Sequence, residues 1–213
     1  MFNTRGHLEA WKRTFRGPSN SPAHHTRVLV IRCPEAITAA DGAEGGWIPT
    51  FSSLERLVVE ESPASNHLNP AAFRKFALTL NSLSVTSPSL PLLQVFDLIR
   101  SLPLLEDLTL AGEADMSYDD PDSPHTVVPS SLEPSLTGAL FLYVIGGIAC
   151  TANRLLNLPN GLRFRKLVLQ WGEREDTRYI AELVTACSGT LRFLDLSYTS
   201  KGTASFCWAN RLS

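Results

Sequence analysis

The chain has 213 residues, of which 44% are hydrophobic and 19% are charged, and its formal net charge is -2. This composition is typical of a globular protein with a substantial core and excludes an intrinsically disordered chain. Residues 1–32 hold six Lys and Arg side chains against one acid, but they lack the density of basic and aromatic residues that nucleic-acid modules have. We therefore expect neither nucleic acid nor a membrane as a partner.

Residues 1–25 are predicted to form an N-terminal capping helix followed by a linker. Leu8, Trp11 and Phe15 recur at the spacing of one helical face. The segment lacks the apolar run of a signal peptide, and the four cysteines are scattered without a C-x-x-C pair. Both features favour reduced thiols and a cytoplasmic or nuclear location.

A short apolar pattern recurs through residues 26–197 and predicts seven strands. The clear copies are LERLVV (54–59), LNSLSV (80–85), LEDLTL (105–110), FRKLVL (164–169) and LRFLDL (191–196), and the weaker ones are TRVLVI (26–31) and TGALFL (137–142). Their central leucines are residues 29, 57, 83, 108, 140, 167 and 194, at separations of 28, 26, 25, 32, 27 and 27. Five of these six intervals lie in the range of roughly 20–29 residues that is typical of leucine-rich repeats.

The segments between the strands have helical patterns. Four of these segments carry apolar residues at helical spacing. The first of them begins with Asn69-Pro70, which resembles a helix start. The apolar residues are Phe73, Phe76 and Ala77; Leu92, Val95, Phe96, Ile99 and Leu102; Ile148, Ala152, Leu155 and Leu156; and Ile180, Leu183, Val184 and Cys187. We therefore predict an α/β leucine-rich-repeat solenoid, with parallel strands on its concave side and helices on its convex side.

Three stretches depart from the repeat. Residues 111–134 are rich in acids and prolines and predict an exposed acidic loop. Residues 136–152 carry no charge, but we interpret them as a buried strand and a buried helix rather than a membrane span. Residues 198–213 form an irregular tail, which either covers the last repeat or reflects a truncated product.

Several of these stretches resemble the F-box and leucine-rich-repeat proteins of mushroom-type fungi (basidiomycetes). The similarity covers about residues 7–202 and includes SVTSPSLPLLQVFDLIRSLPLLEDLTLAG and LPNGLRFRKLVLQW. It implies a repeat domain that selects a target protein for a cullin-type ubiquitin ligase. Only the repeat region matches, because the F-box itself is missing. The resemblance therefore implies ligase recruitment only if the full gene product contains an F-box.

Sequence motifs for catalysis or cofactor binding are absent. The chain has no G-x-S-x-G elbow, P-loop, G-x-G-x-x-G or H-E-x-x-H motif. His24 and His25 are adjacent, and in a strand they would point to opposite faces and could not bind one metal together. We expect no catalytic residue, no cofactor and no metal, and hence a protein that is not an enzyme.

The residues that alternate with the core positions of each strand are predicted to face a binding partner. Aromatic residues are frequent anchors of protein interfaces, so Phe141, Tyr143 and Phe193 stand out. The predicted protein-binding set is Arg56, Val58, Glu60, Ser84, Asp107, Thr109, Phe141, Tyr143, Lys166, Gln170, Phe193 and Asp195.

Two functions are consistent with this sequence. The first is a protein–protein interaction module that resembles the substrate-recognition part of an F-box ubiquitin-ligase adaptor, with an unknown protein target. The second is a truncated remnant that has no independent activity and is structural only.

Overall fold

The structure is a computed structural model of the full chain. It describes residues 1–15, 21–32, 34, 37–43, 46–60, 69–90, 92–114, 134–145 and 147–198. The side chains of residues 39, 89, 90, 114 and 145 are not described, although their backbones are.

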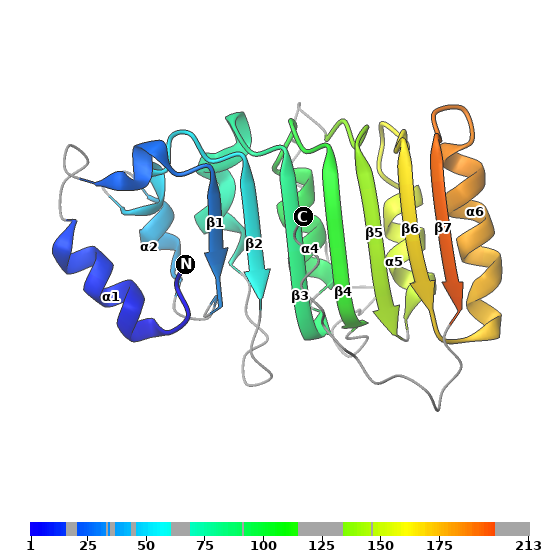
Figure 1. Ribbon diagram of the computed structural model, residues 1–213, viewed down its shortest axis with the longest axis horizontal. Coiled ribbons are helices and arrows are strands. Elements are labelled where there is room, and N and C mark those ends of the chain that lie inside the picture. Colours follow the sequence, from blue (N-terminus) through cyan, green and yellow to red (C-terminus); the bar gives the residue numbers. More distant parts are fainter. Residues whose placement is uncertain are drawn as a thin grey trace.

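One seven-stranded parallel sheet forms the centre of the molecule (Figure 1). Its strands lie side by side in chain order, and every neighbouring pair is parallel. This confirms the predicted α/β class and the predicted parallel strands. The strands are β1 (Val28–Ile31), β2 (Arg56–Glu60), β3 (Ser82–Leu90), β4 (Asp107–Ala114), β5 (Ala139–Ile145), β6 (Lys166–Trp171) and β7 (Phe193–Tyr198).

Helices α4, α5 and α6 lie in a row behind the sheet in Figure 1 and so cover one of its two faces, whereas α1 lies beyond the β1 end of the sheet. Within the described residues, α2 contacts α3, α3 contacts α4, and α5 contacts α6. The helices are α1 (Arg5–Thr14), α2 (Ala39–Gly42), α3 (Pro70–Phe73), α4 (Leu92–Arg100), α5 (Ile148–Leu156) and α6 (Thr177–Cys187). Short 3₁₀ turns join them: η2 (Pro22–His25), η4 (Ile48–Thr50), η5 (Arg74–Leu78) and η6 (Arg174–Asp176).

The predicted central leucines stand in register across all seven strands. Leu29 pairs with Leu57, and the row continues through Leu83, Leu108, Leu140, Leu167 and Leu194. The first six of these leucines are buried in one continuous apolar cluster with the inner faces of the helices. Burying one such side chain contributes about 1.5–3 kcal/mol, so this leucine ladder is a main source of the stability of the fold.

Helices α4, α5 and α6 bury most of the apolar faces that their sequences predict, although Leu156 on α5 and Val184 on α6 are only half-buried. In α4, Leu92, Val95, Phe96 and Ile99 are at most 1% exposed. The uncharged stretch 136–152 forms β5 and the start of α5, as expected. Among the described residues, no helix is both long and apolar enough to cross a bilayer.

The N-terminal segment forms helix α1 and packs against the β1 end of the core, where Leu8 is buried. The backbone of Phe2 pairs with Ile31 alongside β1, and the Phe2 ring packs edge-on against Trp11 and Trp47. The Lys12 ammonium lies 2.7 Å from an Asp41 carboxylate oxygen and so ties α1 to α2. Burial alone would raise the pKa of Asp41, but hydrogen bonds from Lys12 and Thr38 outweigh it and hold that pKa below its ordinary value.

Strands β3 and β4 are longer than the repeat pattern indicates. The register shifts by one residue between Ser87 and Ser89, where β3 bulges opposite Gly112. Gly112 adopts φ +136, which side chains rarely permit. Strand β4 therefore continues through Ala114, four residues into the stretch predicted as an acidic loop, and residues 115–133 of that stretch lie outside the described residues.

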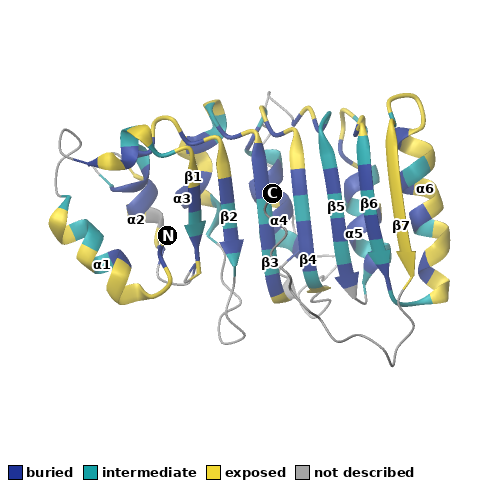
Figure 2. Ribbon diagram, viewed as in Figure 1, coloured by how far each residue is buried: buried dark blue, intermediate teal, exposed yellow. Residues whose placement is uncertain are grey.

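The last strand differs from the other six because its core side is open. Leu194 and Leu196 occupy the ladder positions of Leu167 and Leu169, yet they are 42% and 46% exposed. Figure 2 shows β7 exposed along its whole length. The expectation that Leu194 would be buried like its counterparts is therefore wrong, because no described element packs over it. The irregular tail is predicted to begin at residue 198, but Tyr198 is the last residue of β7, and the rest of the predicted tail, 199–213, lies outside the described residues.

The histidine pair lies outside the strands. His24 and His25 are on the 3₁₀ turn η2. The His24 ring nitrogen Nδ1 is 3.1 Å from the Ser52 hydroxyl. Cys187 is buried, and burial raises the pKa of its thiol, which fits its predicted place on the inward face of α6.

Candidate protein-binding surface

The candidate site is the face of the sheet opposite the helices. We call it the open face and define it by the residues of β1–β7 that alternate with the leucine ladder. Side chains of consecutive strand residues point to opposite sides of a sheet, and the burial of β6 alternates accordingly between half-buried and buried. All twelve residues of the predicted binding set belong to this face.

The parallel register arranges the open face in rows. The middle row is Val30, Val58, Ser84, Thr109, Phe141, Val168 and Asp195. The row towards the amino ends of the strands includes Val28, Arg56, Ser82 and Asp107 on β1–β4, and Ala139, Lys166 and Phe193 on β5–β7. The row towards the carboxyl ends is Glu60, Thr86, Ala111, Tyr143, Gln170 and Ser197.

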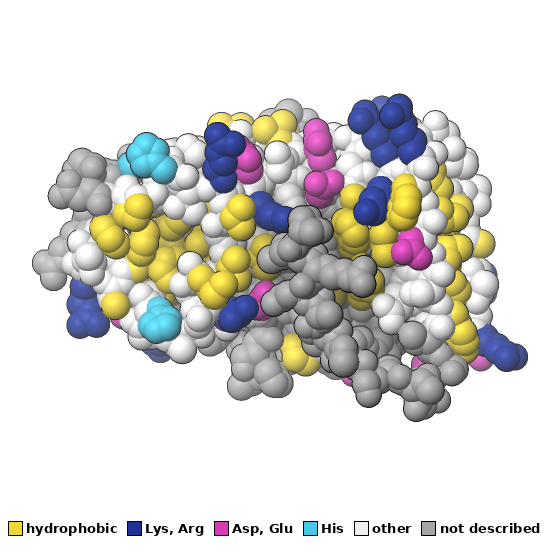
Figure 3. Space-filling view, viewed as in Figure 1, with side chains coloured by type: hydrophobic (Ala, Val, Ile, Leu, Met, Phe, Trp, Pro, Cys, Tyr) yellow, Lys and Arg dark blue, Asp and Glu magenta, His cyan; other side chains and the backbone are white. Residues whose placement is uncertain are grey.

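Two aromatic rings and one cation form the most distinctive group on this face. The Lys166 ammonium lies 5.0 Å from the centre of the Phe141 ring and 4.9 Å from the centre of the Phe193 ring. An ammonium at such a distance is attracted to an aromatic ring. Phe193 remains 49% exposed. We call Phe141, Lys166 and Phe193 the aromatic–lysine cluster, and Figure 3 shows basic and hydrophobic side chains together over β5–β7.

Tyr143 is near this cluster but does not join it. It stands in the carboxyl-end row, opposite Gln170, and is half-buried. Burial raises the pKa of its hydroxyl, and the negative charge of Asp195 raises it further. Of the three aromatic residues predicted as anchors, the structure therefore brings Phe141 and Phe193 together through Lys166 and leaves Tyr143 apart.

Of the two charged open-face residues on β2, Glu60 is paired within the chain and Arg56 is not. Arg32 bonds to Glu60, whereas Arg56 makes no ion pair with any described residue. Ion pairs of this kind leave less charge for a partner. This makes Glu60 a weaker candidate contact than the sequence indicates.

Asp107 has a role inside the fold. One of its carboxylate oxygens accepts a hydrogen bond of 2.7 Å from the backbone N–H of Ala139, at the start of β5. A Cβ on the preceding Gly138 would collide with the same oxygen. Asp107 therefore fixes β5 against β4, which the sequence pattern does not reveal.

The pattern of alternation also misses three arginines next to the cluster. Arg163 and Arg165 precede β6, Arg192 precedes β7, and all three are exposed. Figure 3 shows basic side chains gathered at this end of the sheet. The signal for them in the sequence is the run Arg163-Phe164-Arg165-Lys166, which falls just outside the repeat positions used for the prediction.

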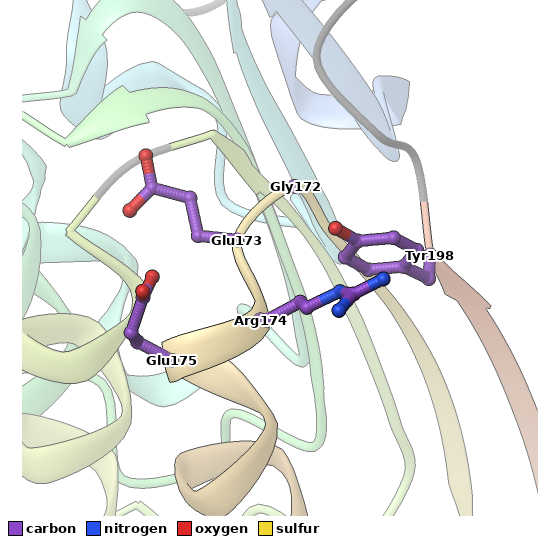
Figure 4. Close-up of a pocket in the computed structure, with 5 residues that line it drawn as sticks. All are labelled: Gly172, Glu173, Arg174, Glu175 and Tyr198. Carbon is purple, nitrogen blue, oxygen red and sulfur yellow. The ribbon is translucent and has the colours of Figure 1, made fainter.

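A shallow depression of about 460 Å³ lies at the opposite ends of β6 and β7 (Figure 4). Arg174 extends towards Tyr198, whereas Glu173 and Glu175 point away from them. The neighbouring Asp176 is buried, and within the described residues its Oδ2 has no hydrogen-bond partner. Burial, followed by the charges of Glu173 and Glu175, raises the pKa of Asp176.

This depression carries no recognisable catalytic arrangement of nucleophile and base among its described residues. In the part of the chain that the structure describes, no group of three His, Cys, Asp or Glu residues could hold a metal ion. The open face, with the exposed Phe193 beside the half-buried Phe141 and Lys166, is the better candidate for a functional surface. Comparison with protein-family models, curated proteins and solved structures found no match for this chain.

Proposed function

We propose that this chain is a leucine-rich-repeat solenoid that acts as a protein–protein interaction module through its open face. Seven units, each with a central leucine in the same register, support the assignment of repeats. A unit of one strand and one helical segment cannot cover its own apolar face, so stacking of successive units supplies the core. The sheet face that the helices leave uncovered is then available to a partner.

The aromatic–lysine cluster is the observation that carries this proposal. Interfaces are enriched in aromatic side chains at their centres, where water is excluded on binding. Phe193 is 49% exposed in the free chain, so contact with a partner would bury a large apolar surface. Removing such an anchor typically costs about 2 kcal/mol or more of binding free energy, a loss of roughly thirtyfold in affinity.

We propose further that the partner is a target protein, as in the F-box and leucine-rich-repeat proteins that the sequence resembles. In that case the repeats would select the target, and a separate F-box in the full gene product would contact the ligase. The proposed location is the cytoplasm or nucleus, and the proposal includes no enzymatic activity. The resemblance of residues 7–202 supports this step.

Affinity capture with matched variants tests the proposed function. The immobilised chain is compared with Phe141→Ala/Phe193→Ala in an extract of the source organism, and bound proteins are identified by mass spectrometry. Leu78→Ala/Leu104→Ala is the control, because these two side chains are 75% and 49% exposed and lie outside the strands. We expect a reproducible partner that the control retains and the double phenylalanine variant loses. Equal capture by all three proteins would refute the proposal.

The second candidate is a structural role without independent binding activity. The exposed Leu194 and Leu196 on the core side of β7 favour it, because uncovered apolar strands promote self-association. Sedimentation velocity over a range of concentrations, together with a thermal melt, distinguishes the two. A monomer that unfolds cooperatively would reject the second candidate.

A further inference from the structure

Four basic side chains gather at the amino ends of β6 and β7. Arg163, Arg165, Lys166 and Arg192 form this group, which we call the basic edge. The N–H of Arg192 donates a 2.7 Å hydrogen bond to the carbonyl oxygen of Arg165, so the two residues are direct neighbours. Phe164 is buried between two exposed arginines, so Arg163 and Arg165 both point away from the core.

The charges of the basic edge are not neutralised by ion pairs within the described residues. Among the described residues, Lys12, Arg27 and Arg32 each make an ion pair, and no member of the basic edge does. Four like charges in one place repel one another and lower the stability of the folded chain slightly. A bound anionic group would remove this repulsion.

The basic edge is continuous with an apolar surface. Lys166 belongs both to the basic edge and to the aromatic–lysine cluster, where it lies against Phe141 and Phe193. A ligand that reaches all of these residues needs carboxylates at one end and an apolar side chain at the other. Arginine pairs with carboxylates through two parallel hydrogen bonds, whereas exposed rings favour an apolar or aromatic side chain.

The surroundings favour a short peptide over nucleic acid. Asp195 follows in the next row of the open face, and Asp107 lies on β4, so acidic side chains interrupt the basic surface. A nucleic acid needs a longer track of positive charge along its backbone, and the net charge of the chain is -2. A peptide with two or three carboxylates needs only the short stretch of positive charge that the basic edge provides.

We propose that the basic edge binds an acidic segment of the partner protein, in which two or more Asp or Glu residues adjoin an apolar side chain that packs on Phe141 and Phe193. This rests on the proposed function and names the chemistry of the partner at one end of the open face. Binding depends on ionic strength, because the charges of the basic edge are exposed to solvent.

Fluorescence anisotropy with a defined probe tests this inference. The probe is a labelled peptide in which Glu and Leu alternate, and a peptide with Gln in place of Glu is its neutral counterpart. The full chain is compared with Arg165→Gln/Arg192→Gln and with the control Arg5→Gln/Arg74→Gln. The control removes the same charge from two exposed arginines on α1 and η5.

We expect the acidic probe to bind the full chain and the neutral peptide not to bind. The Arg165→Gln/Arg192→Gln variant should bind the probe about tenfold more weakly, and the control should change by less than about twofold. Raising the salt from about 0.05 M to about 0.5 M should weaken binding of the full chain more than that of the variant.

Three results would overturn the inference. They are no binding of the acidic probe, equal losses in the variant and the control, and tighter binding of an oligonucleotide or of a phosphoserine peptide of the same charge. Partner capture that still depends on Phe141 and Phe193 would, in that event, leave the proposed function standing. A failure of the proposed function can therefore be distinguished from a failure of this inference.

Discussion

Replacing a leucine of the ladder on each of two strands tests whether the core is closed at β4 and open at β7. Leu108 and Leu194 hold the same register position on β4 and β7. Leu108 is fully buried between Leu83 and Leu140, whereas Leu194 is 42% exposed. Each is changed to Ala, so the chemical change is identical and only the surroundings differ.

The magnitudes follow from what each side chain contacts. Leu108→Ala loses the transfer free energy of the deleted groups and leaves a cavity in a closely packed core, so the free energy of unfolding should fall by about 3–4 kcal/mol. Leu194 is partly in water already, and no described element packs over it. Its replacement should therefore cost about 1 kcal/mol, since little area is lost and water fills the space.

Urea denaturation followed by far-UV circular dichroism measures both values. A loss of about 3 kcal/mol would lower the midpoint of a thermal melt by roughly 6–12 °C in a domain of this size. Equal losses for the two variants would show that the core side of β7 is covered. A loss below about 1 kcal/mol for Leu108→Ala would contradict the single continuous core.

Three further predictions concern particular residues. Asp41 has a lowered pKa, so the stability that its pairing with Lys12 contributes is present above the ordinary value of 3.8 and is lost as the pH falls through the folded-state pKa. Lys12→Met should accordingly cost about 1 kcal/mol in urea denaturation at pH 7 and almost nothing at pH 2, and an equal cost at both values would exclude the ion pair as the cause. Asp176 has a raised pKa and an oxygen without a hydrogen-bond partner among the described residues. The stability that its protonated form contributes is therefore present below the ordinary value of 3.8 and is lost as the pH rises through the folded-state pKa. Asp176→Asn should stabilise the chain by about 0.5–1 kcal/mol at pH 7, and a lower melting temperature for this variant would refute that reasoning. Gly112→Ala should destabilise the bulge by more than about 2 kcal/mol, because the added Cβ meets the carbonyl oxygen of Ser87, whereas Gly161→Ala, at φ +65 with open space around it, should cost only about 1 kcal/mol in thermal melts.

Much of the sheet could be predicted because the leucine ladder is periodic in the sequence. The 27-residue spacing that separates Lys166 from Phe193 also brings these two residues next to each other across β6 and β7. The core faces of α4 and α6 followed from helical spacing alone. Each of these features depends on local periodicity, which a single sequence records.

Other features depend on contacts that no local pattern encodes. The extra length of β3 and β4 requires the bulge at Ser87 and the unusual backbone of Gly112. The exposure of Leu194 depends on whether another element packs over β7, although its local pattern matches that of Leu167. The basic edge combines residues from the segments before two different strands, so only the register of the sheet brings Arg165 and Arg192 together.

Hydroxyl-radical footprinting of the chain bound to its captured partner decides whether the open face is the binding surface, because it reports which side chains a partner covers. We predict that oxidation of Phe193 and Phe141 on the open face decreases on binding, while oxidation of Tyr179 on α6 stays unchanged. Protection of Tyr179 with no change at Phe193 would instead place the partner on the helical side and contradict the proposed function.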